Sequence, residues 1–458
     1  MKRIVIIGAG YSGTVVAARL LRSAAAHSVQ ITLLNGSGHI ARGMAYGTQS
    51  ADHTLNVPAG NMSAYDEEPD HFLDFVKGID PAATSGSFMP RRIYGEYLEW
   101  ILNQAELLTR SGNVLERIYE HVVAICPAEN MASHRVVLGS GRNLHADKVV
   151  LAPGHFPSHN PRIADPAFYN SKRYLRDPWD QARLDAIPAA APVMLIGTGL
   201  TAVDVAMTLL RQNPDRRIDA VSRRGLRPQY HRMVAAKPHE AGTSAIWGDA
   251  STVRAQLRAF RNYCKKLALQ GRDWREGLAI LRPATADIWR AYPPKERRRF
   301  LRHLQPFWDT HRHRLAPAIA ERFEAFIEHG NVRLSAARVL GFEENSSGIK
   351  VTLCHRGSNV PSSIFTQYVI NCTGPCSDPR QVESPLIQQL LREELIRPDA
   401  LGLGIDVDPD CAILTAQGQP SSQLFYIGPW LKADYWEATA VPDLRRFART
   451  LTQKLLSE

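Results

Sequence analysis

The sequence has few cysteines and no long apolar segment. Only six of its 458 residues are cysteine, and none forms a CxxC pair or has the spacing of a zinc site. The closest two, Cys372 and Cys376, stand in a strand-to-turn segment. No stretch approaches the roughly 18 to 20 apolar residues that cross a membrane, and the apolar N-terminus is accounted for as a first strand. We therefore expect a cytoplasmic protein without a metal site or a membrane anchor.

Acidic residues are scarce in one part of the chain. The net charge of +10 comes from residues 254–338, which hold 19 Lys and Arg against 8 Asp and Glu. A basic block of this kind attracts nucleic acid, acidic substrates or cofactor phosphates. Its apolar residues recur at helical spacing, however, and no nucleic-acid-binding motif accompanies the charge. We therefore predict amphipathic helices with basic solvent faces, and no nucleic-acid partner.

A glycine-rich motif follows directly after the first apolar run. Residues 4–7 are too few for a helix, and residues 14–21 have helical composition. Between them stands Gly8-Ala9-Gly10-Tyr11-Ser12-Gly13. This order of strand, turn and helix is typical of a dinucleotide-binding fold, in which the glycines admit a pyrophosphate at the helix N-terminus. The ribose partner at the end of the second strand is normally an acid and here is the uncharged Asn35.

A second motif of the same kind begins 189 positions later. Gly197-Thr198-Gly199-Leu200-Thr201-Ala202 follows an apolar run, and alanine is allowed as its third small residue. The next strand ends in Ser222-Arg223-Arg224, where an NAD site would carry a carboxylate. A hydroxyl and two guanidiniums suit a 2′-phosphate, which favours NADPH over NADH. Because a protein that holds two dinucleotides usually passes electrons between them, we assign FAD to the first motif and NAD(P)H to the second.

Two strand-to-glycine turns bracket the second motif, at residues 149–154 and 368–375. In flavoproteins with two dinucleotides, such turns mark where the chain crosses between domains. We predict an α/β fold of two Rossmann-like domains, with the NAD(P)H domain inserted into a discontinuous FAD domain. The predicted FAD domain comprises residues 1–155 and 335–458. The predicted NAD(P)H domain comprises residues 156–334, and its basic helical block begins near residue 230.

Segments in order along the chain carry a family resemblance. They are residues 43–47, 55–59, 90–98, 197–204, 222–226, 308–314 and 437–442. On these segments the sequence resembles bacterial FAD/NAD(P)-binding oxidoreductases that are distantly related to class B flavin monooxygenases. The group is similar to a flavin-dependent urate hydroxylase and, more remotely, to N-hydroxylating enzymes.

The resemblance implies a monooxygenase that uses FAD, NAD(P)H and O2 to hydroxylate a small polar or heteroaromatic substrate. Urate is the leading substrate, because an anionic purine suits a basic cleft. N-hydroxylation of an amine or amino acid stays open, and so does a reductase that passes electrons to an external acceptor. A redox-sensing flavoprotein is the non-enzymatic alternative. The missing CxxC pair argues against the thioredoxin reductase type, and the sequence does not determine the oligomeric state.

The resemblance also assigns residues to the site. Asn56 is expected beside the flavin ring as a catalytic hydrogen-bonding group, and Arg91 is expected to pair with cofactor phosphate or a substrate anion. His311 and Arg312 belong to the cationic run at residues 311–314 and are expected to contact NADPH or substrate. Because consecutive helical residues point about 100° apart, at most two of the four are expected to face one site.

The remaining predicted contacts lie at turns and strand ends. A proline follows the last strand where flavoproteins of this build usually carry an acid, which weakens the expected ribityl contact there. A helix that begins near residue 441 is expected to direct its N-terminus at the flavin. The residues assigned to the FAD site in these segments are Val123, Gly154, Gly428, Thr439 and Ala440.

Overall fold

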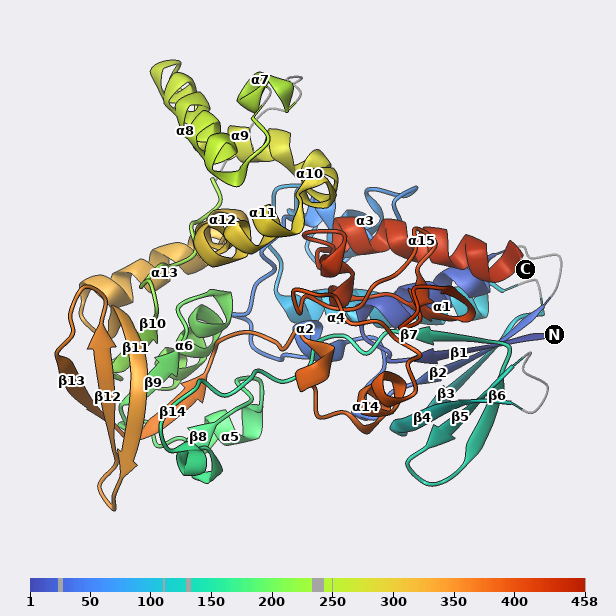
Figure 1. Ribbon diagram of the computed structural model, residues 1–458, viewed down its shortest axis with the longest axis horizontal. Coiled ribbons are helices and arrows are strands. Elements are labelled where there is room, and N and C mark those ends of the chain that lie inside the picture. The colour runs from blue at the N-terminus through green and yellow to red at the C-terminus, as the bar shows by residue number, and fades with distance from the viewer. Residues whose placement is uncertain (24–27, 110–111, 129–132, 233–242, 249, 458) are drawn as a thin grey trace.

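The structure is a computed structural model that describes residues 1–458 except 24–27, 110–111, 129–132, 233–242, 249 and 458. Two sheets surrounded by helices lie side by side, and a block of further helices projects from one side of the molecule (Figure 1). The predicted α/β class with two Rossmann-like domains is confirmed. Part of the predicted helical block, at residues 233–242 and 249, lies outside the described residues.

The first sheet is built around the N-terminal apolar run. Its strand order is β15-β16-β7-β1-β2-β3, and every neighbouring pair except β15–β16 is parallel. The last four residues of β1 are buried, as expected for a parallel strand covered on both faces. The strands are β1 (Lys2–Ile7), β2 (Val29–Leu34), β3 (Val114–Ile118), β7 (Lys148–Leu151), β15 (Ala412–Leu414) and β16 (Pro420–Tyr426).

Helix α1 lies at the centre of the first domain. It contacts both α4 and α15, and 11 of its 12 residues are buried. An antiparallel sheet of order β4-β5-β6 completes the domain, with α14 packed against β4. The elements are α1 (Tyr11–Arg22), α2 (Gly43–Tyr46), η1 (Ala59–Asn61), α3 (His71–Lys77), α4 (Arg91–Leu107), β4 (Val122–Pro127), β5 (His134–Leu138), β6 (Asn143–Ala146), η5 (Pro379–Gln381), α14 (Pro385–Arg392), η6 (Pro429–Ala433) and α15 (Val441–Ser457).

The second sheet has the order β13-β12-β11-β10-β9-β14-β8. Its strands β11, β10, β9, β14 and β8 are parallel, and β12 and β13 extend one edge as antiparallel strands. The elements are η2 (Pro166–Asn170), β8 (Tyr174–Leu175), α5 (Gln181–Asp185), β9 (Val193–Ile196), α6 (Leu200–Gln212), β10 (Ile218–Ser222), α13 (Pro317–Glu328), β11 (Val332–Glu344), β12 (Ile349–His355), β13 (Pro361–Thr366) and β14 (Tyr368–Asn371).

The second domain extends further along the chain than predicted. Residues 335–371 continue the second sheet, because β11 pairs with β10 and β14 pairs with both β9 and β8. This pairing corrects the predicted boundary at residue 334. The chain returns to the first domain only after β14, at the strand-to-glycine turn of residues 368–375.

The two crossing segments lie against each other. Phe156 and Cys376 form an isolated antiparallel bridge, in which the Cys376 amide donates to the Phe156 carbonyl at 3.2 Å. Arg91 at the start of α4 pairs with Asp204 on α6 across the domains, with 2.8 Å between Nη2 and Oδ2. Backbone pairing and a charge pair that is largely removed from water therefore join the two domains.

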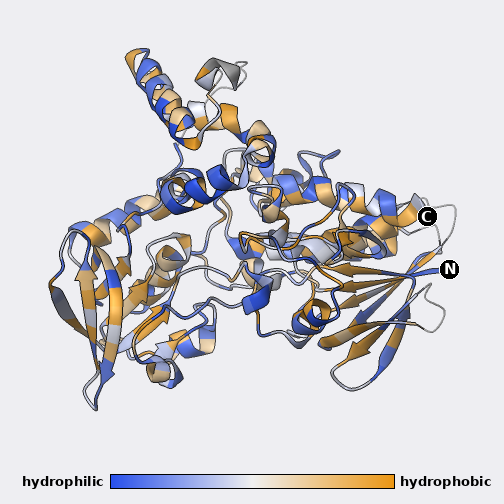
Figure 2. Ribbon diagram, viewed as in Figure 1, coloured by the Kyte–Doolittle hydropathy of each residue, from blue (hydrophilic) through white to orange (hydrophobic). Residues whose placement is uncertain are grey.

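The helical block lies between β10 and β11 in the sequence. The predicted amphipathic pattern is present, and Figure 2 shows hydrophobic and hydrophilic residues alternating along α8. Among the described residues, no helix is both long and apolar enough to cross a membrane. The elements are α7 (Ser244–Trp247), α8 (Val253–Leu269), α9 (Trp274–Leu281), η3 (Arg282–Ala284), α10 (Thr285–Ala291), α11 (Pro294–Arg299), the π-helical turn η4 (Phe300–Leu304) and α12 (Gln305–Arg312).

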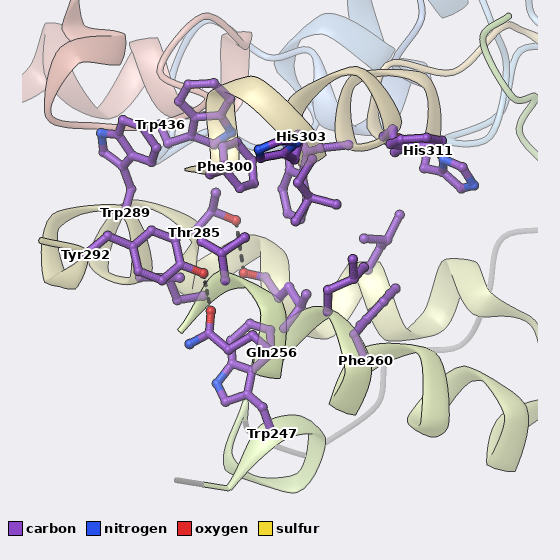
Figure 3. A pocket seen from close by; sticks show the side chains of 18 of the residues that line it. Trp247, Gln256, Phe260, Thr285, Trp289, Tyr292, Phe300, His303, His311 and Trp436 are labelled. Atoms are coloured by element: carbon purple, nitrogen blue, oxygen red, sulfur yellow. Dashed lines mark hydrogen bonds between the residues drawn. The ribbon is translucent and has the colours of Figure 1, made fainter. Parts of the chain in front are cut away.

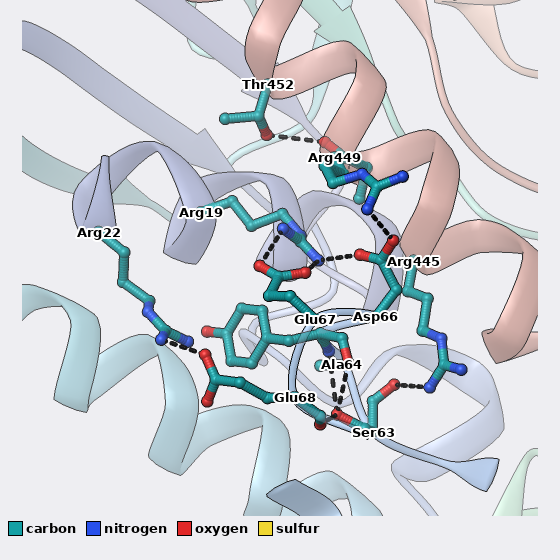
Figure 4. A network of polar contacts seen from close by, with 12 residues as sticks. Arg19, Arg22, Ser63, Ala64, Asp66, Glu67, Glu68, Arg445, Arg449 and Thr452 are labelled. Atoms are coloured by element: carbon teal, nitrogen blue, oxygen red, sulfur yellow. Dashed lines mark hydrogen bonds and ion pairs between the residues drawn. The ribbon is translucent and has the colours of Figure 1, made fainter. Parts of the chain in front are cut away.

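A charge network anchors the loop at residues 63–68 (Figure 4). The side chain of Arg19 on α1 is 7% exposed and pairs with both Asp66 and Glu67 at 2.8 Å. Arg449 on α15 pairs with the second oxygen of Asp66 at 2.6 Å. The network therefore fixes this loop to α1 and α15, the two helices beside the first glycine motif.

We predict that Arg19→Met lowers the free energy of unfolding by about 2 kcal/mol, because Asp66 and Glu67 lose a shared, buried counter-charge. The matched control is Arg22→Met on the same helix. The side chains of Arg22 and Glu68 are 40% and 36% exposed, so Arg22→Met is expected to lower the free energy of unfolding by less than about 1 kcal/mol. Urea unfolding curves of the two variants measure the difference, and equal losses would contradict the assignment.

Candidate functional site

The glycines of the first motif are required by close backbone contacts. Gly8 has a φ of 107°, and a Cβ there would lie 2.0 Å from the carbonyl oxygen of Ala152. A Cβ at Gly13 would lie 1.9 Å from the carbonyl oxygen of Gly8. The turn between β1 and α1 therefore accepts no side chain at either position, as the dinucleotide motif demands.

The surroundings of this turn fit a bound cofactor. A Cβ at Gly10 would lie 3.6 Å from the Cα of Gly43, so α2 rests beside the motif. The hydroxyls of Tyr11 and Tyr94 are buried and have no hydrogen-bond partner among the described residues. Burial raises the pKa of both hydroxyls well above the ordinary value. Buried polar groups normally have partners, and these two hydroxyls have none among the described residues.

Two other residues assigned to the first cofactor lie near strand ends. Asn35 directly follows β2, and its side-chain amide donates to the Ser37 hydroxyl and the His39 carbonyl. Val123 lies in β4 at a shift in the pairing register with β5. Nothing in the geometry tests a cofactor contact by either residue, and both assignments stay predictions.

The second motif lines a cleft of about 810 Å³ at the carboxyl ends of β9 and β10, which we call the nucleotide cleft. Gly197 has a φ of 124°, and a Cβ there would lie 2.4 Å from the carbonyl oxygen of Cys372. No atom of a described residue lies within 4 Å of a Cβ placed at Gly199, so the cleft is open at this glycine. The structure brings together all the residues predicted for this site: Gly197, Gly199, Leu200, Thr201, Ser222, Arg223 and Arg224.

The two predicted phosphate-binding arginines have different surroundings. The guanidinium of Arg224 donates to the carbonyls of Arg302 and His303 and lies 5.2 Å from the ring centre of Phe307. Arg223 is exposed and has no hydrogen bond or ion pair with a described residue. Of the two guanidiniums, that of Arg223 is therefore free, whereas that of Arg224 is bonded to the turn η4, and the contact with a 2′-phosphate stays a prediction.

A second cleft of about 760 Å³, which we call the central cleft, lies between the N-terminus of α15 and the loop at residues 55–62. Asn56 lines it, and the His231 imidazole donates to the Asn56 carbonyl at 3.0 Å. Thr439 and Ala440 lie on its other side, just before α15, as the sequence predicts. Gly154 and Gly428 line neither cleft, and their assignment to the cofactor stays a prediction.

The two clefts meet at His313 and Lys432, which line both. Removal from bulk water lowers the pKa of the Lys432 ammonium, and Asp309 and Glu437 oppose this shift. The same cause lowers the pKa of His313, although 39% of its side chain is accessible, because the cleft walls surround it. Sequence reasoning missed Lys432, which no motif marks. From the sequence, His313 was recognised only as part of the cationic run at residues 311–314.

Arg312 is held by Glu437 rather than left free. Its Nε donates to Glu437 Oε2 at 2.7 Å, and the Trp308 indole donates to Oε1 of the same carboxylate at 2.7 Å. The side chains of Arg312 and Glu437 are 15% and 4% exposed. Arg312 therefore lines the central cleft with its charge balanced by a protein carboxylate, and its contact with NADPH or substrate stays a prediction.

Arg91 is likewise already paired. Its partner Asp204 is buried. The Nε of Arg91 also donates to the Thr54 carbonyl at 3.1 Å. The packing of the N-terminus of α4 against α6 brings the charges of Arg91 and Asp204 together. Arg91 also lines the central cleft, and its pairing with cofactor phosphate or a substrate anion stays a prediction.

His311 lies away from both clefts. It contacts the Trp274 ring at 4.8 Å between ring centres and lines an apolar cavity in the helical block. The expectation that at most two of residues 311–314 face one site is also corrected, because Arg312, His313 and Arg314 all line the central cleft. The reason is that α12 ends at Arg312, after which the backbone leaves helical geometry.

Two cations of the central cleft, Arg314 and Lys432, have no ion pair with a described residue, although the Lys432 ammonium lies 4.3 Å from the ring centre of Trp436. Arg314 has no hydrogen bond or ion pair with a described residue, and its Nε is buried. Burial, together with the charges of Arg312 and Arg275, lowers the pKa of Arg314 to about 10. Among the described residues, no group of His, Cys, Asp and Glu has the arrangement of a metal site.

A family model described as FAD-NAD(P)-binding matches residues 5–156. This match and the fold confirm the resemblance to FAD/NAD(P)-binding oxidoreductases and support both predicted cofactors. No curated protein matches the chain by sequence.

Solved structures share the fold across the whole chain. Ornithine hydroxylase from Pseudomonas aeruginosa is 17% identical, covers 100% of this chain and 99% of its own, and has a TM-score of 0.64. A cadaverine monooxygenase from Erwinia amylovora, solved with FAD, is 13% identical at 99% and 94% coverage, with a TM-score of 0.66. Thioredoxin reductase from Lactococcus lactis is 12% identical with full coverage of both chains and a TM-score of 0.53. At these identities the likeness establishes the fold.

We predict that alanine substitutions at the two glycines of the second motif affect different properties, stability at Gly197 and NADPH binding at Gly199. Gly197→Ala is expected to lower the free energy of unfolding by about 3 kcal/mol, because of its positive φ and its contact with the Cys372 carbonyl. Gly199→Ala is expected to change it by less than about 0.5 kcal/mol but to weaken NADPH binding, because its methyl group occupies the open side of the turn. Urea unfolding and NADPH titration measure the two effects, and equal unfolding curves would contradict the geometry.

Proposed function

We propose that the protein is an FAD-dependent monooxygenase that uses NADPH and O2 to N-hydroxylate an amine carrying a carboxylate. The observation that carries the proposal is the meeting of the two clefts at His313 and Lys432. A nicotinamide in the nucleotide cleft and a flavin in the central cleft would face each other there. When bound, reduced flavin supplies the oxygen chemistry, and the protein has to orient both cofactors and the substrate.

The charge of the central cleft supports an anionic substrate group. Seven arginine and lysine side chains line it, against the single carboxylate of Glu437. Most of these cations are paired with carboxylates, and Arg314 has no such partner among the described residues. A carboxylate or another anion on the substrate would supply the hydrogen bonds that Arg314 lacks.

The same positive charge favours a neutral amine. An alkyl ammonium ordinarily has a pKa near that of lysine, about 10.4, and nearby cations lower it because they disfavour a further positive charge. Nitrogen can attack an oxygen donor only through its free electron pair, so the amine has to lose its proton first.

The structural neighbours favour N-hydroxylation over urate hydroxylation. Three of them are an ornithine hydroxylase, an L-lysine 6-monooxygenase and a cadaverine monooxygenase. Urate rests only on the resemblance of the sequence and the basic cleft. Asn56 is retained as the proposed hydrogen-bonding group beside the flavin, because its position on the central cleft agrees with that role.

We predict that Arg223→Ala raises the KM for NADPH about tenfold, because one charge-assisted contact with the 2′-phosphate is lost. The KM for NADH is expected to change less than about twofold, since NADH has no phosphate at this position. Arg224→Ala is the control, because its guanidinium is bonded to η4 and its loss is expected to change both KM values alike. Equal changes of the KM values for NADPH and NADH in Arg223→Ala would contradict a contact between Arg223 and the 2′-phosphate.

We predict that an amine with a carboxylate stimulates NADPH oxidation more than the same amine without it. L-lysine and cadaverine are a matched pair, because they differ only in the carboxylate. The measurement is O2 uptake by the FAD-loaded protein, with one N-hydroxylated product for each NADPH consumed. Arg314→Gln is expected to raise the KM for lysine about tenfold and to leave that for cadaverine unchanged.

The rate of amine-stimulated O2 uptake is expected to rise with pH, because the neutral amine is the reactive form.

Other outcomes of this experiment would point elsewhere. Hydroxylation of urate without any response to amines would restore urate as the substrate. Faster NADPH loss with a quinone or ferric acceptor, without an oxygenated product, would indicate a reductase. A protein that cannot bind FAD would overturn the proposal altogether.

A further inference from the structure

The helical block contains a cavity of its own, of about 450 Å³, which we call the aromatic cavity (Figure 3). Its volume is within the range of small-molecule sites. In Figure 3, Phe300, His303 and Trp436 lie across the cavity from Gln256 and Phe260. Eight aromatic side chains line it: Trp247, Phe260, Trp289, Tyr292, Phe300, Phe307, Trp308 and Trp436.

The cavity explains an incomplete burial pattern in α8. This helix has an apolar stripe, yet only Val253 and Leu267 among its 17 residues are buried. Leu257 and Phe260 on that stripe line the cavity and remain partly exposed. Protein interiors are normally close-packed, so an apolar stripe that faces an open cavity has room for an apolar occupant.

The polar groups of the cavity define the charge of that occupant. None of the 19 lining residues is a carboxylate, whereas Arg261, His303 and His311 are basic. Arg261 is exposed and has no ion pair with a described residue. An ammonium group would find no counter-charge here, but a carboxylate would.

A buried donor without a partner supports the same conclusion. Trp436 is 4% exposed and lines the cavity, and its indole N–H has no acceptor among the described residues. Its ring contacts Trp289 and Phe300 at 4.7 and 5.1 Å between centres, so its position is fixed. Buried donors normally have a partner, and an oxygen or ring nitrogen of an occupant would supply one.

From these observations we infer that the aromatic cavity binds an aromatic small molecule that is neutral or anionic. The site is separate from the central cleft. Trp308 forms part of its wall and donates to Glu437, which lines the central cleft. The occupant therefore lies one layer of side chains from the proposed position of the flavin. The inference concerns binding and does not depend on the proposed N-hydroxylation.

The experiment compares two probes with the same ring and opposite charge, 2-naphthoate and 2-naphthylmethylamine, by isothermal titration calorimetry. It uses the FAD-loaded full chain without NADPH. We expect 2-naphthoate to bind at least about tenfold more tightly than the amine, because only the anion gains from the basic lining. Equal binding of the two probes, or no binding of 2-naphthoate, would overturn the inference.

Two pairs of variants locate the site. Leu257→Trp fills the cavity and is expected to weaken 2-naphthoate binding about tenfold. Its control is Leu269→Trp, which adds the same side chain at a 90% exposed position of the same helix and is expected to leave binding unchanged. Arg261→Glu is expected to weaken 2-naphthoate about fivefold and to strengthen the amine, whereas Arg258→Glu makes the same change on an exposed residue outside the cavity. Equal effects within either pair would place the binding elsewhere.

The variants also separate this inference from the proposed function. Binding of the probe is measured without turnover, so it is expected even if the protein hydroxylates no amine. Thermal unfolding shows whether Leu257→Trp still folds. If Leu257→Trp does not fold, the comparison of 2-naphthoate binding between Arg261→Glu and Arg258→Glu, both at exposed positions, tests the location of the site.

Discussion

The ion pair between Arg312 and Glu437 is the contact on which the rest of the site depends. It joins the last residue of α12 to the segment before α15, and the Trp308 indole donates to the same carboxylate. Both charges are largely removed from water, so the loss of one partner would leave the other uncompensated. One set of contacts therefore attaches the helical block to the FAD domain and builds the wall between the central cleft and the aromatic cavity.

The backbone at Glu437 is part of this arrangement. Its φ of 73° lies in the left-handed region, which costs a residue other than glycine about 1–3 kcal/mol. Such a conformation persists only when surrounding contacts hold it, and here an arginine and an indole bind the two carboxylate oxygens. The carbonyl of Glu437 also accepts from the Thr439 amide at 2.6 Å, which turns the chain toward α15. The strained residue therefore positions both the wall and the helix N-terminus that faces the central cleft.

The sequence predicted those features that depend on residues close together in the chain. Both glycine motifs, the two strand-to-glycine turns and the amphipathic helices are local patterns, and the described residues have them where they were expected. The surroundings of Arg91 and Arg224 were not predictable, because their partners are residues 204 and 302–303, far away in the sequence. Lys432 and Arg314 carry no motif, and only the packing of three segments shows that they line the central cleft. The second domain boundary was misplaced because it depends on the pairing of β11 with β10 and of β14 with β9, which joins residues far apart in the sequence.

The end of α12 explains how one cationic run serves separate sites. As long as the helix continues, its side chains point in different directions, so His311 faces the aromatic cavity and Asp309 faces the nucleotide cleft. Once the helix ends at Arg312, the chain extends and can direct consecutive side chains into the central cleft. The change in backbone geometry at one residue thus divides the run: the central cleft receives Arg312, His313 and Arg314, and the aromatic cavity receives His311. This division is the physical reason for assigning an anionic, polar substrate to the first and a flat, uncharged or anionic ring to the second.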